Sequence, residues 1–370
     1  MGGHATVEGV GMTEFGDAYR GRRVLLTGHT GFKGSWLALW LSRLGAIVTG
    51  VALAPETTPN HWDLLGLNMA SHMVDIRDRD ALARVVADAQ PEVVFHLAAQ
   101  PLVRRSYREP VDTWATNVMG TANLLECCRS APSVQGVLVV TSDKCYENHE
   151  WVWGYRENDR LGGHDPYSAS KAATELLVAS YRASFFHAVD APALASARAG
   201  NVIGGGDWSE DRLIPDVVRA VTQGTAVEIR SPAATRPWQH VLESLSGYLL
   251  LGQRLLARRH DAAEAWNFGP AEEGNRPVQA VMERIAELWP AMHWHVANNA
   301  DLHEARLLYL DSAKSRAGLQ WQPVWGFDDA LAATVAWYRA YLSQGAVISG
   351  EQLDQYVQAA RARNLAWCQS

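Results

Sequence analysis

The sequence predicts an α/β protein with a doubly wound parallel sheet and a smaller, mixed α/β lobe towards its C-terminus. Over the first 200 residues, short apolar runs alternate with amphipathic helical patterns, an order that is typical of parallel sheets. Beyond Gly200, residues 204–206 are three glycines, and helices and short strands then mix less regularly. We therefore predict a core at residues 12–200, to which 238–270 return, and a lobe made of 201–237 and 271–370.

The predicted elements follow from apolar spacing and from the residues at their ends. The first helix carries Trp36, Leu37 and Trp40 on one face, and Asp78 and Asp165 stand where helix N-caps are expected. Strands are predicted at 23–27, 46–53, 73–75, 93–97, 136–141, 193–198, 226–230 and 265–268. Helices are predicted at 34–44, 78–88, 110–129, 167–187, 213–222, 242–259 and 278–289, and a last one begins near Phe327.

The composition excludes several classes of protein. The formal charge is −7, the pI is near 6.0 and no run of five or more basic residues occurs, which argues against a nucleic-acid surface. No apolar run approaches the length of a membrane span. Most of the 15 tryptophans are expected to pack in the core or the lobe, and some to wall a pocket. Residues 1–11 are expected to form an unstructured leader, with Met12 as the original start.

The four cysteines give no sign of a metal site. Cys127 and Cys128 are adjacent, the other two are isolated, and no pair has metal-ligand spacing. Thiols in this pattern fit the reducing cytoplasm, where we expect the protein to work. His293 and His295 are better explained by alternation along a strand than by metal binding, so no metal is expected.

A glycine-rich segment joins the first predicted strand to the first predicted helix. Its residues are Gly28, His29, Thr30, Gly31, Phe32, Lys33 and Gly34, with the spacing Gly-x-x-Gly-x-x-Gly. Glycines there allow a tight turn and a close approach of the backbone, and a helix N-terminus binds pyrophosphate. The segment therefore predicts a dinucleotide site, against the alternative of a tight strand-to-helix turn without a ligand.

The rest of the predicted dinucleotide site lies at other strand ends, where open α/β sheets bind their ligands. The residues expected to contact the cofactor there are Asp75, Ile76, Leu97, Ala98, Ala99 and Gln100. The second strand ends at 51–54, in Val-Ala-Leu-Ala, with neither an acidic residue for the ribose hydroxyls nor an arginine for a 2′-phosphate. NAD is favoured over NADP on this basis, although Lys33 leaves NADP open.

Tyr167 and Lys171 stand four residues apart, on the helix that Asp165 and Pro166 are expected to start. Positions i and i+4 lie on one face of a helix, one turn apart. An ammonium about 4 Å from a phenol would favour the phenolate by up to roughly 4 kcal/mol at an effective dielectric near 20. We therefore expect Lys171 to lower the pKa of Tyr167 from about 10 by about two or three units, less what burial takes back. Tyr167 would then accept a proton from an alcohol; an exposed helix face with an aromatic anchor is the alternative.

A second cluster, Thr141-Ser-Asp-Lys-Cys-Tyr146, lies upstream of this pair. With it and the glycine-rich segment, the chain resembles the extended short-chain dehydrogenase/reductase superfamily, whose core is a Rossmann fold. Within that superfamily it is similar to the nucleotide-sugar 4,6-dehydratases over about residues 22–345, and most closely to those that act on CDP-glucose. The similarity to the CDP-glucose enzymes rests on Lys144, because the dTDP-glucose enzymes typically have glutamate at that position.

The resemblance implies a reaction in which hydride leaves C4 of a hexose, water leaves across C5 and C6, and the hydride returns to C6. It implies that Tyr167, with Lys171 beside it, takes the C4 hydroxyl proton while Ser142 hydrogen-bonds the same oxygen. Lys144, if burial makes it neutral, would take the C5 proton, and Asp143, if protonated, would donate to the departing C6 hydroxyl. The alternative for 143 and 144 is a solvated ion pair in a loop.

The same resemblance nominates further binding residues and partners. Asn117 and Thr141 join the residues expected around the cofactor, which is NAD. The sugar nucleotide is expected at Ser142, Asn201, Arg212, Leu213, Arg236, His240, Asn267 and Arg306. Arginine suits a pyrophosphate because its fork-shaped guanidinium donates two hydrogen bonds at once. The helices at 110–129 and 167–187 are expected to pair with a second subunit, in a homodimer or a homotetramer.

Three other functions stay open on the sequence. A dTDP- or GDP-hexose 4,6-dehydratase and a nucleotide-sugar epimerase would use the same scaffold. Lys144 weighs against the dTDP enzyme, and an epimerase needs no acid and base at 143 and 144. A non-catalytic dinucleotide sensor is a function of another class; it predicts damage at Tyr167 or Lys171, and both are intact.

Overall fold

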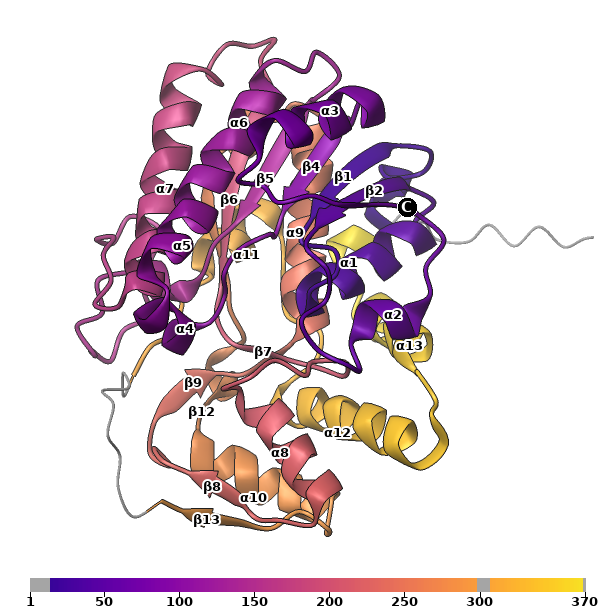
Figure 1. The fold of residues 1–370 in the computed structure, drawn as a ribbon, viewed down its shortest axis with the longest axis vertical. Helices are drawn as coiled ribbons and strands as arrows, with labels where there is room; N and C mark the ends of the chain where they lie inside the picture. The colour runs from indigo at the N-terminus through magenta and orange to yellow at the C-terminus, as the bar shows by residue number, and fades with distance from the viewer. Residues whose placement is uncertain (1–13, 298–306, 369–370) are drawn as a thin grey trace, which may run out of the picture.

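The computed structural model describes residues 14–297 and 307–368, and a seven-stranded sheet lies at its centre (Figure 1). The strands are β1 (Arg23–Thr27), β2 (Ile47–Ala52), β3 (Ala70–Met73), β4 (Val93–His96), β5 (Gly136–Val140), β6 (Ala193–Ala199) and β11 (Ala265–Phe268). Their order is β11-β6-β5-β4-β1-β2-β3, and every neighbouring pair is parallel. The predicted doubly wound parallel sheet is confirmed, with its order turning back between β1 and β4.

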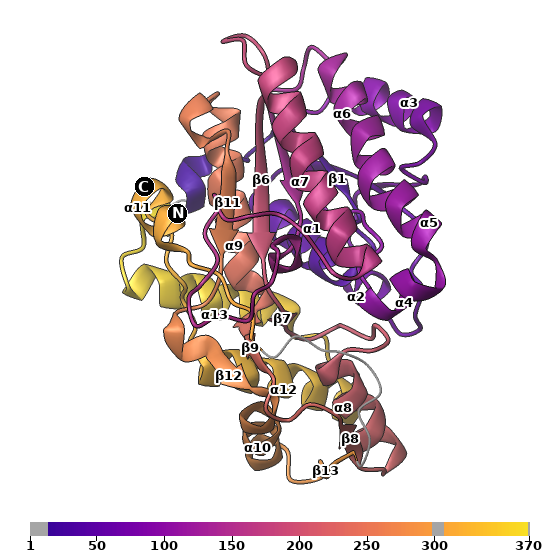
Figure 2. The same cartoon turned by 90° about the vertical axis from the view of Figure 1, so that its left-hand side faces the viewer.

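Helices cover both faces of this sheet and also form part of the lobe. They are α1 (Phe32–Arg43), α2 (His61–Leu65), α3 (Arg79–Ala89), α4 (Val103–Arg108), α5 (Pro110–Trp114), α6 (Thr121–Arg129), α7 (Pro166–Ser184), α8 (Leu213–Gln223), α9 (Val241–Leu256), α10 (Val278–Leu288), α11 (Ala313–Leu319), α12 (Phe327–Gln344) and α13 (Ser349–Ala362). One apolar cluster joins the sheet to α3, α6 and α7, and a larger one joins its other face to α1 and α9. Figure 2 shows α3 and α6 to the right of the strands and α9 to the left.

The lobe below the sheet in Figure 1 consists of short strand pairs and helices. Parallel pairs join β7 (Val202–Ile203) to β10 (Gln239–His240) and β8 (Val227–Ile229) to β13 (Trp294–Val296), and an antiparallel pair joins β9 (Thr235–Pro237) to β12 (Asn275–Pro277). His295 lies within β13, as its predicted alternation on a strand requires. α9 and β11 follow lobe sequence but pack on the core sheet. Among residues 14–297 and 307–368, none of the helices combines the length and the apolar character that a bilayer span requires.

The structure corrects several predicted elements. α2, α4, α11 and α13 have no counterpart among the predicted helices, and because α13 follows α12, the helix that begins at Phe327 is not the last one. The single helix predicted at 110–129 is interrupted by a π-helical turn at Ala115–Gly120, where a side chain on Gly120 would come within 2.5 Å of Ile76. β3 begins three residues before its predicted position; all its residues are exposed, so no apolar run marks it. Short 3₁₀ turns lie at Glu14–Asp17, Asp143–Cys145, His260–Ala262, Glu272–Gly274 and Ala366–Cys368.

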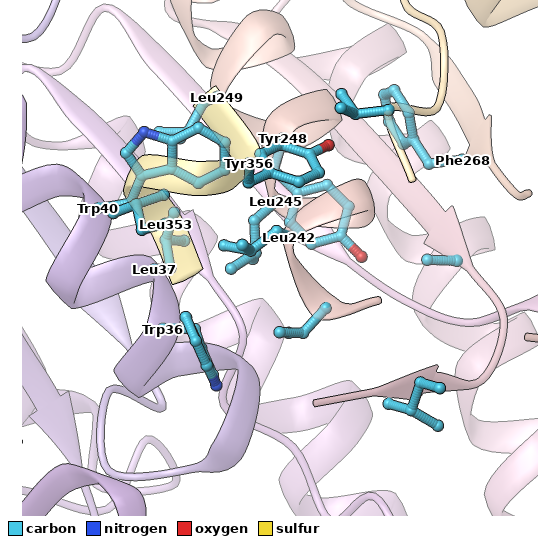
Figure 3. Close-up of a cluster of buried hydrophobic side chains, with 14 of the residues drawn as sticks. Trp36, Leu37, Trp40, Leu242, Leu245, Tyr248, Leu249, Phe268, Leu353 and Tyr356 are labelled. Atoms are coloured by element: carbon cyan, nitrogen blue, oxygen red, sulfur yellow. The ribbon is translucent and has the colours of Figure 1, made fainter. Parts of the chain in front are cut away.

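Aromatic and leucine side chains lock α1 against α9 and α13 (Figure 3). The residues labelled there are Trp36, Leu37, Trp40, Leu242, Leu245, Tyr248, Leu249, Phe268, Leu353 and Tyr356. Burying each such side chain contributes roughly 1.5–3 kcal/mol of hydrophobic stabilisation. Trp36, Trp40, Trp321, Trp337 and Trp367 are fully buried, so the prediction that most tryptophans pack in the interior is confirmed for these. The packing fixes α1, and with it the glycine-rich segment at its N-terminus.

Candidate active site

A cavity of about 1480 Å³ lies at the carboxyl ends of β1, β4 and β5 and extends to the lobe. Of the predicted site residues, those that line it are Gly28, Thr30, Gly31, Phe32, Lys33, Gly34, Asp75, Ile76, Leu97, Ala98, Ala99, Gln100, Thr141, Ser142, Asp143, Lys144, Tyr167, Lys171, Asn201, Arg212, Leu213 and Arg236. Residues from the core and from the lobe thus meet in one space, at the point where the strand order turns back. Open α/β sheets bind their ligands at this place.

The glycine-rich segment forms a backbone cradle beside the cavity. Gly28 has a φ of +76°, and a Cβ there would lie 2.7 Å from the backbone nitrogen of Ala98. A Cβ on Gly34 would lie 1.9 Å from the carbonyl oxygen of Gly28, so only glycine fits at either place. The N-cap of α1 is Gly31, and no side chain caps the first-turn amides. Uncapped N–H groups at a helix N-terminus fit a pyrophosphate, so these residues fit a bound dinucleotide.

Two residues predicted to touch the cofactor do not line the cavity. His29 is fully buried, with Nε2 2.7 Å from the Ser71 hydroxyl, and its ring fills the space beside Gly50. The amide of Asn117 hydrogen-bonds the backbone N–H and C=O of Gln100, at 2.8 and 3.1 Å. Both predictions of direct contact are therefore corrected: His29 supports the strands below, and Asn117 shapes the loop after β4.

Tyr167 and Lys171 lie on the first turns of α7, as predicted. Asp165 caps the helix by accepting a hydrogen bond from the Ser168 N–H at 2.9 Å, and Pro166 takes the first helical position. Both side chains are buried, with exposed fractions of 7% and 5%. Burial raises the pKa of Tyr167 to about 12, and its hydrogen bond with the Ser142 side chain only partly opposes this. The predicted net lowering of this pKa is therefore wrong for the protein without ligands.

Lys171 is itself affected by its surroundings. Burial lowers the pKa of its ammonium to about 8, although Glu175 one turn further along α7 acts to raise it. Its Nζ donates to the carbonyl oxygen of Val140, at the end of β5, at 3.4 Å. Glu175 in turn forms a buried ion pair with Arg198 of β6 at 2.8 Å and accepts a hydrogen bond from the Thr141 hydroxyl. This network ties α7 to β6 and to the end of β5, which residues 142–144 follow.

The three residues after Thr141 turn into the cavity beside Tyr167. The Ser142 hydroxyl donates to Oδ1 of Asp143 at 2.9 Å and accepts from the backbone N–H of Lys144 at 3.2 Å. Asp143 is 2% exposed, and its Oδ2 has no hydrogen-bond partner among the described residues. Lys144 is only half-buried, so the burial that its predicted neutral form requires is incomplete. The Asp143 carboxyl thus lies near the buried phenol of Tyr167, and Lys144 lines the same cavity.

Lys33 points inward from the glycine-rich segment. Its Nζ lies 3.4 Å from the hydroxyl of Tyr248 on α9. Burial lowers the pKa of Lys33 to about 7, with Arg212 and Lys171 adding to the effect and Asp143 opposing it. This lysine therefore joins the charges around the reaction centre.

The residues predicted for the sugar nucleotide divide into two groups. Arg212 donates to Asp207 at 3.1 Å and Arg236 donates to the backbone of Thr235, and both guanidinium groups line the cavity with Asn201 and Leu213. His240 and Asn267 are fully buried and do not line it. The His240 ring packs against Trp36 and Trp325, and Asn267 bonds Tyr146 and the backbone of Tyr155. Arg306 lies outside the described residues.

Sequence reasoning missed a group of charged residues that line the same cavity. They are Glu56, Arg104, Arg105, Glu210 and Asp211. Arg105 of α4 donates to both carboxylate oxygens of Glu56, at 2.7 and 2.8 Å, and lies 3.5 Å from Glu210. Arg104 donates to Asp211 at 2.8 Å. The adjacent arginines after a strand end were the available signal, but their partners are distant in the sequence.

Comparisons with known proteins give consistent results. The sequence matches the family described as GDP-mannose 4,6 dehydratase over residues 25–334. It is 47% identical, over 92% of this chain and 98% of the relative, to the CDP-glucose 4,6-dehydratase of Salmonella typhimurium. Its structure is similar to that of epimerase Mth375 of Methanothermobacter thermautotrophicus, with a TM-score of 0.77, 25% identity and 90% and 96% of the two chains covered. It is also similar to DesIV, a dTDP-glucose 4,6-dehydratase of Streptomyces venezuelae solved with NAD bound, with a TM-score of 0.73, 25% identity and 87% and 98% covered.

Proposed function

The chain belongs to the GDP-mannose 4,6-dehydratase family of extended short-chain dehydrogenases/reductases, and from this premise we propose that it converts CDP-D-glucose to CDP-4-keto-6-deoxy-D-glucose and water. One observation carries the proposal. Ser142, Asp143 and Lys144 lie beside Tyr167 in a single cavity, in a chain that is 47% identical to a CDP-glucose 4,6-dehydratase. A simple alcohol dehydrogenase needs neither the acid nor the second base.

An NAD-type dinucleotide is the cofactor, as the likeness to an NAD-bound dehydratase supports, and we propose NAD rather than NADP. The backbone of the glycine-rich segment and the first turn of α1 would hold its pyrophosphate. Asp75 and Ile76 would contact the adenine, and 97–100 and Thr141 would contact the rest of the molecule. When bound, the dinucleotide accepts the hydride from C4 and later returns it to C6. Asn117 acts indirectly, through the loop after β4.

Tyr167 takes the proton of the C4 hydroxyl, and Ser142 hydrogen-bonds the same oxygen. Because burial raises the pKa of Tyr167, the phenolate needs positive charge close by. Lys171 supplies one such charge from the same helix face, and an oxidised nicotinamide would supply another. The tyrosine therefore becomes a base only in the loaded site.

Lys144 and Asp143 divide the elimination of water between them. Lys144 removes the C5 proton, which the 4-ketone makes acidic; its half-buried side chain loses more water when the sugar fills the cavity. Asp143 delivers a proton to the departing C6 hydroxyl. Its Oδ1 is occupied by the Ser142 hydroxyl, so the buried Oδ2 is the oxygen that carries this proton.

The lobe holds the nucleotide part of the substrate. Arg212 and Arg236 bind the diphosphate through their guanidinium groups, with Asn201 and Leu213 beside them. Arg306 stays a further candidate. We propose that residues 12–200 and 238–270 bind the cofactor, and that 201–237 and 271–370 bind the sugar nucleotide.

The working form is a homodimer or homotetramer in the cytoplasm. Exposed apolar side chains lie on the two predicted pairing helices: Val111 and Met119 within 110–129, Leu176 on α7, and Phe185 at its end. Exposed apolar groups of this size mark contact surfaces when they gather together. The free, buried thiols suit a reducing compartment.

The proposal can be tested by incubating the purified, NAD-loaded protein with CDP-glucose and measuring the mass of the nucleotide sugar. We expect the nucleotide sugar to lose the mass of one water. An unchanged mass with a new sugar isomer would instead indicate an epimerase, and an unchanged substrate would indicate a dinucleotide sensor. Parallel incubations with dTDP-glucose and GDP-mannose identify the base, since faster loss of water from either would displace CDP-glucose as substrate.

A further inference from the structure

We propose that Glu56 and Arg105 together select the dinucleotide: Glu56 accepts the two adenosine ribose hydroxyls of NAD and keeps the 2′-phosphate of NADP away from Arg105. The inference rests on the dinucleotide site of the proposed function and names the residues that choose its cofactor. Neither residue belongs to the glycine-rich segment or to the catalytic group.

The position of the ribose follows from the sheet. A bound dinucleotide would have its pyrophosphate at the N-terminus of α1, after β1, and its adenine near Asp75 and Ile76, after β3. Because β2 stands between β1 and β3, the ribose crosses the end of β2. Residues 52–54 line the cavity there, and their side chains are those of alanine, leucine and alanine. The Thr30 hydroxyl donates to the carbonyl oxygen of Leu53 at 2.9 Å, which ties the glycine-rich segment to this strand end.

Glu56 is the first acidic residue after β2, and it lines the same cavity. Dinucleotide-binding folds grip the ribose hydroxyls of NAD with a carboxylate that follows β2. Here the strand end has none, and the loop supplies it. The hydrogen bonds from Arg105 hold both oxygens of Glu56 in a fixed plane, at 2.7 and 2.8 Å. A carboxylate has about four acceptor positions, so two remain for the ribose hydroxyls.

The same pair discriminates against NADP. The guanidinium of Arg105 lowers the pKa of Glu56, so the carboxylate is ionised at neutral pH and repels a 2′-phosphate. Arg105 would attract that phosphate, but its Nη1 and Nη2 already donate to Glu56. Removing the charge of Glu56 therefore weakens the contact with NAD and frees Arg105 for NADP.

Asp75 is the competing carboxylate. It also lines the cavity, but Arg77 engages it through both its guanidinium and its backbone N–H. Asp75 lies at the adenine end of the site, after β3, rather than at the end of β2. Substitution of Asp75 therefore tests whether the carboxylate after β3, rather than Glu56 after β2, selects the dinucleotide.

Equilibrium titrations of the protein with NADH and with NADPH test the inference without any turnover. Energy transfer from tryptophan to the nicotinamide measures how much of each dinucleotide is bound. We expect the wild type to prefer NADH. Glu56→Gln should reduce the ratio of the two affinities by at least about tenfold, the factor that the loss of one charge-assisted hydrogen bond gives. In the double variant Glu56→Gln/Arg105→Gln, the gain for NADPH should disappear. Glu210→Gln is the matched control, since it removes the other carboxylate near Arg105 and should leave the ratio unchanged.

A wild type that prefers NADPH, an unchanged ratio in Glu56→Gln, or a larger change in Asp75→Asn would each overturn the inference. So would the loss of both dinucleotides in a Glu56→Gln protein that unfolds at the wild-type temperature. The proposed reaction is tested separately, because a wild type that removes no water from CDP-glucose fails as a dehydratase whatever the affinity ratio.

Discussion

At Tyr167, burial raises the pKa and the hydrogen bond with Ser142 lowers it, and burial is the stronger. The four-residue spacing places Lys171 on the same helix face, but its Nζ donates to the carbonyl oxygen of Val140. Burial lowers the pKa of Lys171 to about 8 and raises that of Tyr167 to about 12. The spacing predicts that the two side chains share a helix face, whereas the size of any effect on the pKa depends on how dry the cavity is. Spacing alone therefore predicts the residues of a base but not its strength.

Lys144 carries the step that separates a dehydratase from an epimerase. Lys144→Ala should slow exchange of the C5 proton with solvent by at least about a hundredfold, the lower end of what a general base contributes. Transfer of hydride from C4 should fall much less, because Tyr167 and Ser142 stay in place. Incorporation of deuterium at C5 and the single-turnover appearance of NADH measure the two steps. Arg160→Met, on the same cavity wall, is the control. If Lys144→Ala keeps the same fraction of the wild-type rate for C5 proton exchange as for hydride transfer from C4, then Lys144 is not the base.

Among the elements, those with strong local signals are predicted closely, and those created by tertiary contacts are not. α7 begins where Asp165 and Pro166 place it, and β11 has its predicted bounds. β3 is an exposed edge strand without an apolar run, and the π-helical turn in 110–129 depends on the contact of Gly120 with Ile76. The local sequence encodes caps and periodicity, whereas these features depend on residues elsewhere in the chain.

In the candidate site, too, features formed by one continuous segment could be predicted, and features formed by contacts between distant segments could not. Its backbone cradle and its Ser142–Lys144 turn could be predicted, because each is one continuous segment. His240 is named by resemblance, yet its ring packs between α1 and the segment before α12. Glu56 could not be predicted, because it is positioned by Arg105, 49 residues away. Contacts between segments decide which polar residues face the ligand.

A buried ion pair between Glu175 and Arg198 joins α7 to β6. Glu175 and Arg198 have side chains that are 2% and 4% exposed. Glu175→Gln leaves a buried charge without its partner and should cost about 3–5 kcal/mol in the free energy of unfolding, measured in urea. Glu175→Leu/Arg198→Met should cost less than the single change. Glu126→Gln, which breaks the exposed pair with Arg129, should cost under about 1 kcal/mol. Equal costs in the two single variants would contradict this expectation.

Over the whole molecule, the proposed subunit contact can be tested on the exposed apolar surface of its helices. Leu176 is 61% exposed on α7, and Met119 is 58% exposed on the neighbouring helix. Leu176→Arg should shift the protein towards a monomer, because a charge buried in a subunit contact has no partner. Light scattering coupled to size exclusion measures the mass. Val189→Arg changes a more exposed apolar residue, 86% exposed and outside both helices, and should leave the mass unchanged; the same mass for both variants would place the contact elsewhere.

Glu243 joins the core to the C-terminal helices. It is fully buried on α9 and accepts hydrogen bonds from the backbone N–H groups of Val324 and Trp325, at 2.8 and 2.7 Å, and from the Tyr356 hydroxyl at 3.0 Å. Burial raises the pKa of this carboxyl from its ordinary value of 4.5 to about 7, against the pull of its three donors. The connection between α9, α12 and α13 therefore depends on a group that titrates near neutral pH.

The sign of the resulting pH dependence can be worked out. Between pH 4.5 and about 7 the folded protein binds a proton at Glu243 that the unfolded chain releases. The stabilising contribution of Glu243 is therefore complete below pH 4.5 and is lost as the pH rises through about 7. It amounts to at most about 3–4 kcal/mol, because a pKa difference of one between the folded and unfolded states corresponds to about 1.4 kcal/mol. Glu243→Gln cannot titrate, while every other ionisable group is common to both proteins. The free energy of unfolding of the wild type minus that of Glu243→Gln, measured in urea from pH 5 to pH 8, should therefore fall up to about pH 7 and then level off; a difference that stays constant throughout would mean that Glu243 keeps an ordinary pKa in the folded protein.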